Sequence, residues 1–157
     1  MKKIVKIIGG LSGVGGLIYL VAEWQQKCID RWKEQAEKNR AMFILMDQWV
    51  NIRQRGRNLE EYFLKNEYHR IAVYGMGVLG KRLIRELDNS KIQVAYGIDR
   101  NRDMVYTDLE VVTTEDELKK VDAVVVTVVK DFDAIREALS KKMECQVIAI
   151  EDILGEF

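Results

Sequence analysis

Three closely spaced glycines form the motif of this sequence with the clearest chemical meaning. Gly75, Gly77 and Gly80 stand in the spacing G-x-G-x-x-G, after an apolar run and at the start of an amphipathic segment. In such a motif the first glycine allows a tight turn, the second lets a pyrophosphate approach the backbone, and the third lets a helix pack closely on a strand. The open N–H groups at the start of that helix attract anions. The predicted cofactor-binding residues of this loop are Gly75, Met76, Gly77, Val78, Leu79 and Gly80.

A carboxylate follows the motif at the distance that a nucleotide site requires. Asp99 closes the predicted second strand, 19 residues after Gly80, where an acidic side chain accepts hydrogen bonds from a ribose diol. Arg100 beside it could face a 2′-phosphate, but Asp99 would repel that group. The predicted ligand is therefore NAD, and NADP or a nucleotide-sugar in the same cleft is less favoured. The alternatives without a ligand are a plain tight turn at the glycines and a polar strand exit at Asp99 and Arg100.

The elements that must position these residues alternate between strands and helices from residue 69 onward. Strands are expected at 70–74, 92–98, 109–113, 123–129 and 146–150, and helical segments at 78–87, 115–119 and 132–142. Strands that alternate with helices form parallel βαβ units with right-handed crossovers, which makes this an α/β domain. The run at 123–129 is continuously apolar and rich in valine, as a strand covered on both faces must be. Within it, we expect Thr127 to be a strand residue rather than a ligand contact.

Residues 69–157 resemble the NAD(P)-binding Rossmann family and, more narrowly, the small Rossmann modules of bacterial nucleotide-sugar and surface-polysaccharide biosynthesis proteins. The likeness lies in the segments IAVYGMGVLGKRL, YGIDRN and VIAIEDIL. It implies a Rossmann-like parallel sheet of about five strands in the order 3-2-1-4-5. It also implies that the three glycines contact phosphate and that Asp99 contacts ribose. In some modules of this kind the same cleft holds a nucleotide-sugar instead of a dinucleotide.

Composition limits the chemistry that this chain can perform. Lysine and arginine total 25, as do aspartate and glutamate, so the formal net charge is zero and nucleic-acid binding is not expected. With a single histidine, His69, and two separated cysteines, Cys28 and Cys145, we expect neither a metal site nor a disulfide. No Tyr-x-x-x-Lys pair follows the glycine motif, and no second domain supplies a proton donor for hydride transfer. No catalytic residue is predicted, and whether the protein is an enzyme stays open.

Three functions fit this pattern. The first is a nucleotide-binding module of polysaccharide or nucleotide-sugar metabolism that acts with a partner or at a membrane. The second is an NAD-dependent oxidoreductase or epimerase-like subunit whose catalytic groups come from another chain. The third is a helical assembly protein in which the Rossmann unit is a scaffold. Because the chain lacks recognisable catalytic groups, we favour the first.

The first 22 residues differ in composition from the rest of the chain. An uncharged run at 7–22 contains five glycines and follows three lysines. A helix extended back to residue 4 approaches the ~30 Å thickness of the hydrocarbon core, so residues 4–22 are predicted to form a membrane anchor. A helix of a soluble protein and a cleaved signal peptide are the alternatives. Lysine and arginine are more numerous after the run than before it, which predicts that the nucleotide domain is cytoplasmic. If residues 4–22 form the anchor, this domain is attached to the cytoplasmic face of the membrane.

Residues 23–68 are predicted to form a helical arm. Residues 23–54 contain no helix breaker, and their apolar side chains recur every three or four residues over three heptads. The predicted seam consists of Ile29, Trp32, Ala36, Asn39, Phe43, Met46 and Val50. This seam predicts self-association through residues 23–54, in which Asn39 would fix the register of the paired helices. The alternative is that the seam packs on the protein's own domain. A second, short helix is expected at 59–65.

Overall fold

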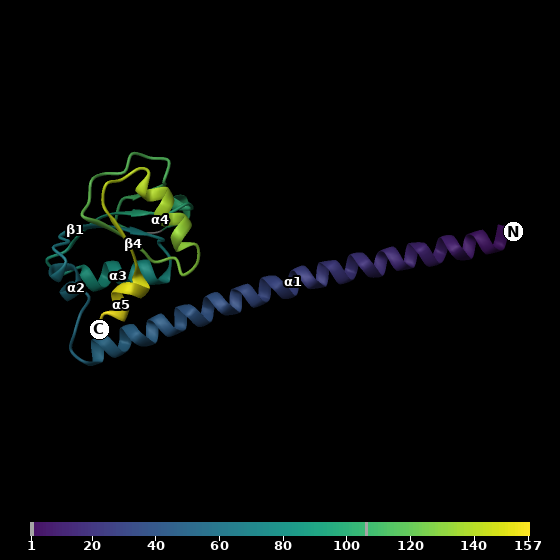
Figure 1. Cartoon of the computed structure of the whole chain (residues 1–157), viewed down its shortest axis with the longest axis horizontal. Helices are drawn as coiled ribbons and strands as arrows, with labels where there is room; N and C mark the ends of the chain where they lie inside the picture. Colours follow the sequence, from purple (N-terminus) through teal and green to yellow (C-terminus); the bar gives the residue numbers. More distant parts are fainter. Residues whose placement is uncertain (1, 106) are drawn as a thin grey trace. The chain divides into compact units, whose positions relative to one another are not determined.

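The computed structural model describes residues 2–105 and 107–157 and, in the first helix, the side chains from Tyr19 onward. The chain divides into two compact units, Met1–Arg40 and Ala41–Phe157. The first unit consists of helix alone, whereas the second contains all the strands and the remaining helices (Figure 1). Helix α1 (Lys2–Gln54) contributes residues to both units.

A parallel five-stranded sheet forms the centre of the second unit. Its strands are β1 (Arg70–Tyr74), β2 (Gln93–Ile98), β3 (Val111–Val112), β4 (Ala123–Val126) and β5 (Gln146–Ala149). The order across the sheet is β3-β2-β1-β4-β5, and every pair is parallel. All four side chains of β4 are buried because both faces of the sheet are covered. The predicted α/β fold and its strand order are confirmed.

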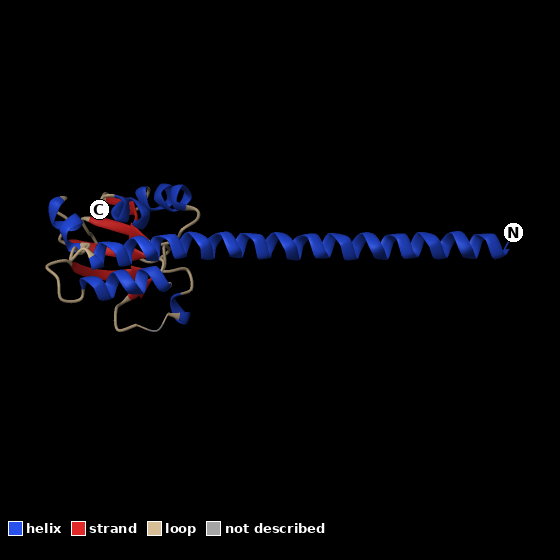
Figure 2. Ribbon diagram, turned by 90° about the horizontal axis from the view of Figure 1, so that it is seen from below, coloured by secondary structure: helices blue, strands red, loops and turns tan. Residues whose placement is uncertain are grey.

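Helices cover both faces of this sheet (Figures 1 and 2). The helices after α1 are α2 (Glu60–Lys65), α3 (Val78–Leu87), α4 (Phe132–Ser140) and α5 (Ile150–Gly155), with a 3₁₀ turn at Arg102–Met104. One core joins β1 to α2, α3, α5 and the last part of α1, and includes Leu79, Leu83 and Leu87 on one face of α3. The second core lies under α4, where Ile135 and Leu139 pack near Tyr96.

The last part of α1, which belongs to the second unit, packs on the rest of that unit through a face that the heptad pattern did not predict. Leu45, Trp49 and Ile52 are buried in the first core. Among the predicted seam residues of this part, Phe43 is 72% exposed and Val50 is 47% exposed, and Met46 is partly buried against the core. Of these three seam residues, only Met46 therefore packs against the core of its own domain. Because this neighbouring face is buried, the compact unit begins at Ala41 and not near residue 69.

Two further segments differ from the prediction. The expected helical segment at 115–119 is absent: the Asp116 carboxylate accepts hydrogen bonds from the N–H and the hydroxyl of Thr113, which holds a turn there instead. These bonds hold the pKa of Asp116 below its ordinary value. The last strand ends at Ala149, and the helix α5 that follows directly was not predicted. The short helix after α1 was predicted, and the Asn58 and Glu61 side chains each accept the other residue's backbone N–H around its first turn.

The predicted membrane anchor, residues 4–22, lies largely outside the residues whose side chains are described. Within the described part of the chain, no helix has an apolar stretch long enough to cross a bilayer. At the described end of the segment, Tyr19 and Leu20 are exposed. The anchor stays a prediction.

Candidate functional site

The glycine motif forms the connection between β1 and α3. Gly75 follows β1 with a φ of +92°, a conformation that side chains with a Cβ rarely adopt. Its N–H donates a hydrogen bond to the Ile98 carbonyl at 2.8 Å, and a Cβ on Gly75 would lie 2.7 Å from Val128 Cγ2. A Cβ on Gly80 would overlap the Gly75 carbonyl oxygen. Both glycines are therefore required by the protein's own backbone and packing.

Gly77 differs from its two neighbours in the motif. Its φ of −76° and extended ψ of −155° are open to other residue types. A Cβ on Gly77 would meet no other atom within 4 Å, and the residue is exposed. Neither backbone conformation nor packing within the described chain requires a glycine here.

Gly77 is the N-cap residue directly before α3, and no side chain forms a capping hydrogen bond there. The first bond of the helix runs from the Lys81 N–H to the Gly77 carbonyl at 3.1 Å. The N–H groups of the first helical turn, which have no partner within a helix, thus open beside the unfilled space at Gly77. Such a terminus carries a partial positive charge and can bind an anion.

Asp99 lies at the same loop. One carboxylate oxygen accepts a hydrogen bond from the Met76 N–H at 2.8 Å, and the other accepts one from the Asn101 N–H at 2.8 Å. The side chain is half-buried, and each oxygen keeps a further lone pair. The structure therefore brings Asp99 and the glycine loop together, and it shows Asp99 as a fixed part of the loop and not as a free carboxylate.

The other predicted contacts are distributed differently. The side chains of Met76 and Leu79 are buried in the first core, so only their backbone can face a ligand. Val78 is 54% exposed at the start of α3. Arg100 lines a cavity of about 300 Å³ with Tyr74 and residues of α4, the helix that covers the opposite face of the sheet from α3.

Thr127 supports the loop, a role that the sequence did not reveal. It follows β4 and is buried, and its hydroxyl donates a hydrogen bond to the Gly75 carbonyl at 2.6 Å. The same oxygen lies 3.1 Å from the Tyr74 carbonyl. Its signal in the sequence is a single polar residue within an otherwise apolar run. That signal gains meaning only when β4 is placed beside β1.

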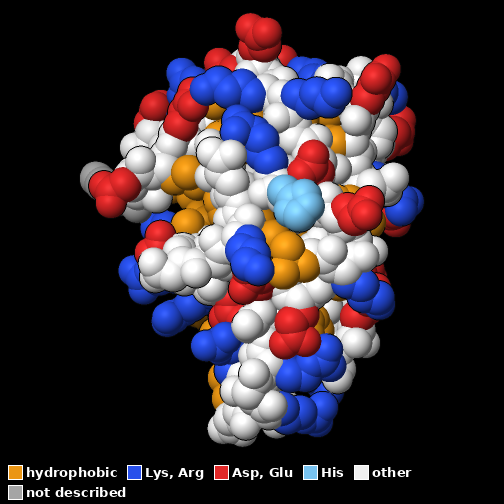
Figure 3. Space-filling model, turned by 90° about the vertical axis from the view of Figure 1, so that its left-hand side faces the viewer, with side chains coloured by type: hydrophobic (Ala, Val, Ile, Leu, Met, Phe, Trp, Pro, Cys, Tyr) orange, Lys and Arg blue, Asp and Glu red, His pale blue; other side chains and the backbone are white. Residues whose placement is uncertain are grey.

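The amino-terminal end of β1 carries a second polar arrangement. One oxygen of Asp122 accepts the N–H groups of His69 and Arg70 at 2.8 Å and 2.7 Å, and these bonds hold the pKa of Asp122 below its ordinary value. His69 is exposed, and charges of both signs surround the histidine on the face shown in Figure 3.

Burial raises the pKa of the Cys145 thiol, which makes it a poor nucleophile. Among the described residues, no three metal-ligating side chains come together.

The fold and the loop define an α/β protein with a parallel five-stranded sheet and a glycine-rich turn at the carboxyl end of its first strand. Comparison of the chain with protein-family models, with curated proteins and with solved structures returned no match. The resemblance to nucleotide-sugar and polysaccharide modules therefore stays a prediction.

Proposed function

We propose that the protein binds a nucleotide, with its phosphates at the glycine loop and the start of α3. The observation that carries this proposal is Gly77. Gly75 and Gly80 are explained by backbone conformation and packing, whereas nothing in the described chain needs a glycine at position 77. A ligand that approaches the backbone there supplies the missing reason, and the uncapped N-terminus of α3 favours an anionic one.

Asp99 supports a ribose next to the phosphates. Its two oxygens are oriented by the Met76 and Asn101 N–H groups, and their remaining lone pairs can accept hydroxyl donors. A 2′-phosphate would meet a carboxylate fixed in place, and Arg100 lies toward α4. We therefore propose NAD as the preferred dinucleotide over NADP. A nucleotide-sugar remains the second candidate, because its diphosphate and ribose present the same groups.

We propose from the sequence resemblance alone that the protein serves polysaccharide or nucleotide-sugar metabolism. On the same ground, we propose that it acts with a partner or at a membrane. The alternatives are separated by what binding leads to. Binding without turnover supports a module, and turnover with a second chain supports an oxidoreductase or epimerase-like subunit. A folded protein that binds none of these ligands supports an assembly protein in which the sheet is a scaffold.

The test is a substitution that fills the space at Gly77. Calorimetric titration with NAD, NADP and a UDP-sugar should show binding by the unaltered chain. Gly77→Val should weaken that binding at least about tenfold, or ~1.4 kcal/mol, because its side chain occupies the space left for phosphate. The matched control is Gly155→Val, since a Cβ on Gly155 also meets nothing within 4 Å. Equal affinity of the folded Gly77→Val protein would remove the phosphate loop from the proposal.

A further inference from the structure

An apolar strip on the last part of α1 is only partly covered by the rest of the second unit. It is formed by Phe43, Met46 and Val50, which follow one another at spacings of three and four on one face of the helix. Phe43 and Val50 are 72% and 47% exposed, and no described part of the second unit covers them. Exposed apolar side chains that gather on one face mark an interaction surface more often than those scattered singly.

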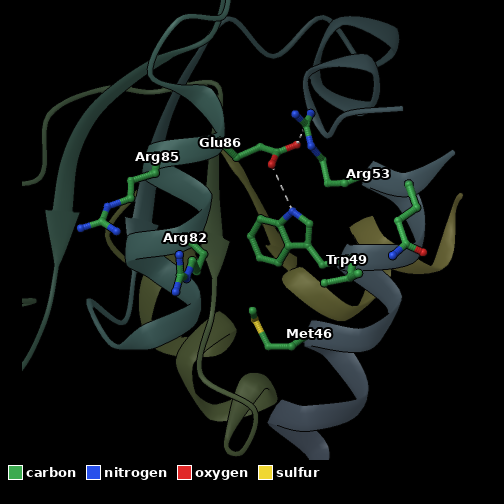
Figure 4. A pocket seen from close by; sticks show the side chains of 8 residues that line it. Met46, Trp49, Arg53, Arg82, Arg85 and Glu86 are labelled. Atoms are coloured by element: carbon green, nitrogen blue, oxygen red, sulfur yellow. Dashed lines mark hydrogen bonds and ion pairs between the residues drawn. The ribbon is translucent and has the colours of Figure 1, made fainter. Parts of the chain in front are cut away.

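A groove with a basic edge runs along one side of this strip. Its volume is about 630 Å³, and it lies between α1, with Met46, Trp49 and Val50, and α3, with Arg82 and Arg85 (Figure 4). Glu86 of α3 links the two helices that line the groove, because its carboxylate accepts hydrogen bonds from the Trp49 indole and the Arg53 guanidinium of α1, each at 3.3 Å. In Figure 4, Arg82 lies on the side of Trp49 and Met46, whereas Arg85 extends away from them.

At the level of Met46 and Val50, the two long edges of the strip carry opposite charges that no ion pair within the described chain neutralises. Arg82 and Arg85 are exposed, and neither forms an ion pair with a described residue. The other edge carries Asp47, which stands four residues after Phe43 and three before Val50. The Asp47 carboxylate accepts a hydrogen bond from the Asn51 side chain at 3.3 Å and is likewise in no ion pair within the described chain.

We propose that this strip binds the same strip on a second copy of the chain. An apolar centre with a cationic edge and an anionic edge is complementary to itself under a two-fold rotation. When the rotation axis runs along the helix, the two α1 segments are parallel, and each copy's Asp47 edge faces the other copy's Arg82 edge. An antiparallel pair would place Asp47 opposite Asp47. The charges therefore select the parallel dimer, and Met46 and Val50 supply its apolar contact.

Charge exchange in the whole 157-residue chain tests this arrangement, with sedimentation equilibrium as the measurement. Asp47→Arg and Arg82→Glu should each raise the dimer dissociation constant about tenfold or more, since like charges then face each other on both sides of the two-fold axis. The double variant Asp47→Arg/Arg82→Glu restores opposite charges and should return to within about threefold of the unaltered chain. Lys91→Glu, an equal charge reversal on an exposed lysine outside the groove, should leave the constant unchanged.

Three results would overturn the proposal. The first is a monomeric chain at ~100 µM, a concentration that reveals even weak dimers. The second is dimerisation that neither single exchange weakens, which would place the interface elsewhere or make it antiparallel. The third is failure of the double variant to recover while circular dichroism shows that it is folded. None of these results bears on nucleotide binding, which is measured by titration.

Discussion

Substitution of Gly80 by alanine tests how closely α3 rests on the glycine loop. A Cβ at this position would lie closer than 3.0 Å to the Gly75 carbonyl oxygen and 3.1 Å from Thr127 Oγ1. The first neighbour is a backbone atom, so it cannot rotate away, and the helix and the loop must separate. Overpacking costs about 1–3 kcal/mol of folding stability, and we take about 3 kcal/mol here because a backbone atom is the obstacle. Alanine has a better helix propensity than glycine, which offsets about 1 kcal/mol of this loss. The net loss is about 2 kcal/mol, which lowers the melting temperature of a unit of this size by about 6–10 °C.

Scanning calorimetry on the full chain measures this effect, and Gly77→Ala is the matched control. Both changes add one methyl group to the same motif, but a Cβ on Gly77 meets nothing within 4 Å. Gly77→Ala should therefore change stability by less than about 0.5 kcal/mol, because a weaker helix start and a less flexible unfolded chain nearly cancel. The reasoning fails if Gly80→Ala melts with the unaltered protein, or if the two variants lose the same stability.

Two other substitutions follow from the same structure. Thr127→Val should lower the free energy of unfolding in urea by about 1–3 kcal/mol because the buried Gly75 carbonyl loses its donor, whereas Thr127→Ser keeps the hydroxyl and should lose about 1 kcal/mol. Equal losses for the two variants would show that the hydroxyl is unimportant. The pKa of the Asp122 carboxyl is lower in the folded protein than its ordinary value of 3.8. The stability that this carboxylate contributes is therefore fully present above about pH 3.8, and it is lost as the pH falls through the lower pKa of the folded state. Asp122→Asn should therefore show a smaller fall in urea midpoint on acidification below about pH 4, and an identical fall would contradict this role.

Local sequence patterns were sufficient for the sheet and for the loop. A strand covered on both faces is apolar at every position, as the valine run of β4 is. A helix covered on one face has an apolar residue every three or four positions, as Leu79, Leu83 and Leu87 of α3 show. The meeting of Asp99 with the loop also followed from the sequence, since both stand at the carboxyl ends of adjacent parallel strands.

What the sequence left hidden depends on neighbours that are distant along the chain or on competing local bonds. Thr127 acquires its partner only when β4 lies beside β1. The turn at Thr113 and Asp116 replaced an expected helix because side-chain hydrogen bonds to the backbone compete with helical ones. On α1, apolar residues occupy two adjoining faces, and periodicity alone cannot say which face the domain buries. The structure assigns burial to Leu45, Trp49 and Ile52.

The margins of the sheet have a consequence for how copies of this protein can meet. A sheet edge presents unpaired backbone groups to which a strand of another molecule can add, and long flat edges lead to aggregation. Here one margin is β3, only two residues long, and the other is β5, whose four residues pass directly into α5. Within the part of the chain that the structure describes, both margins are too short to make good templates for intermolecular strand addition. The proposed dimer accordingly uses a helical surface, whose side chains can select one geometry.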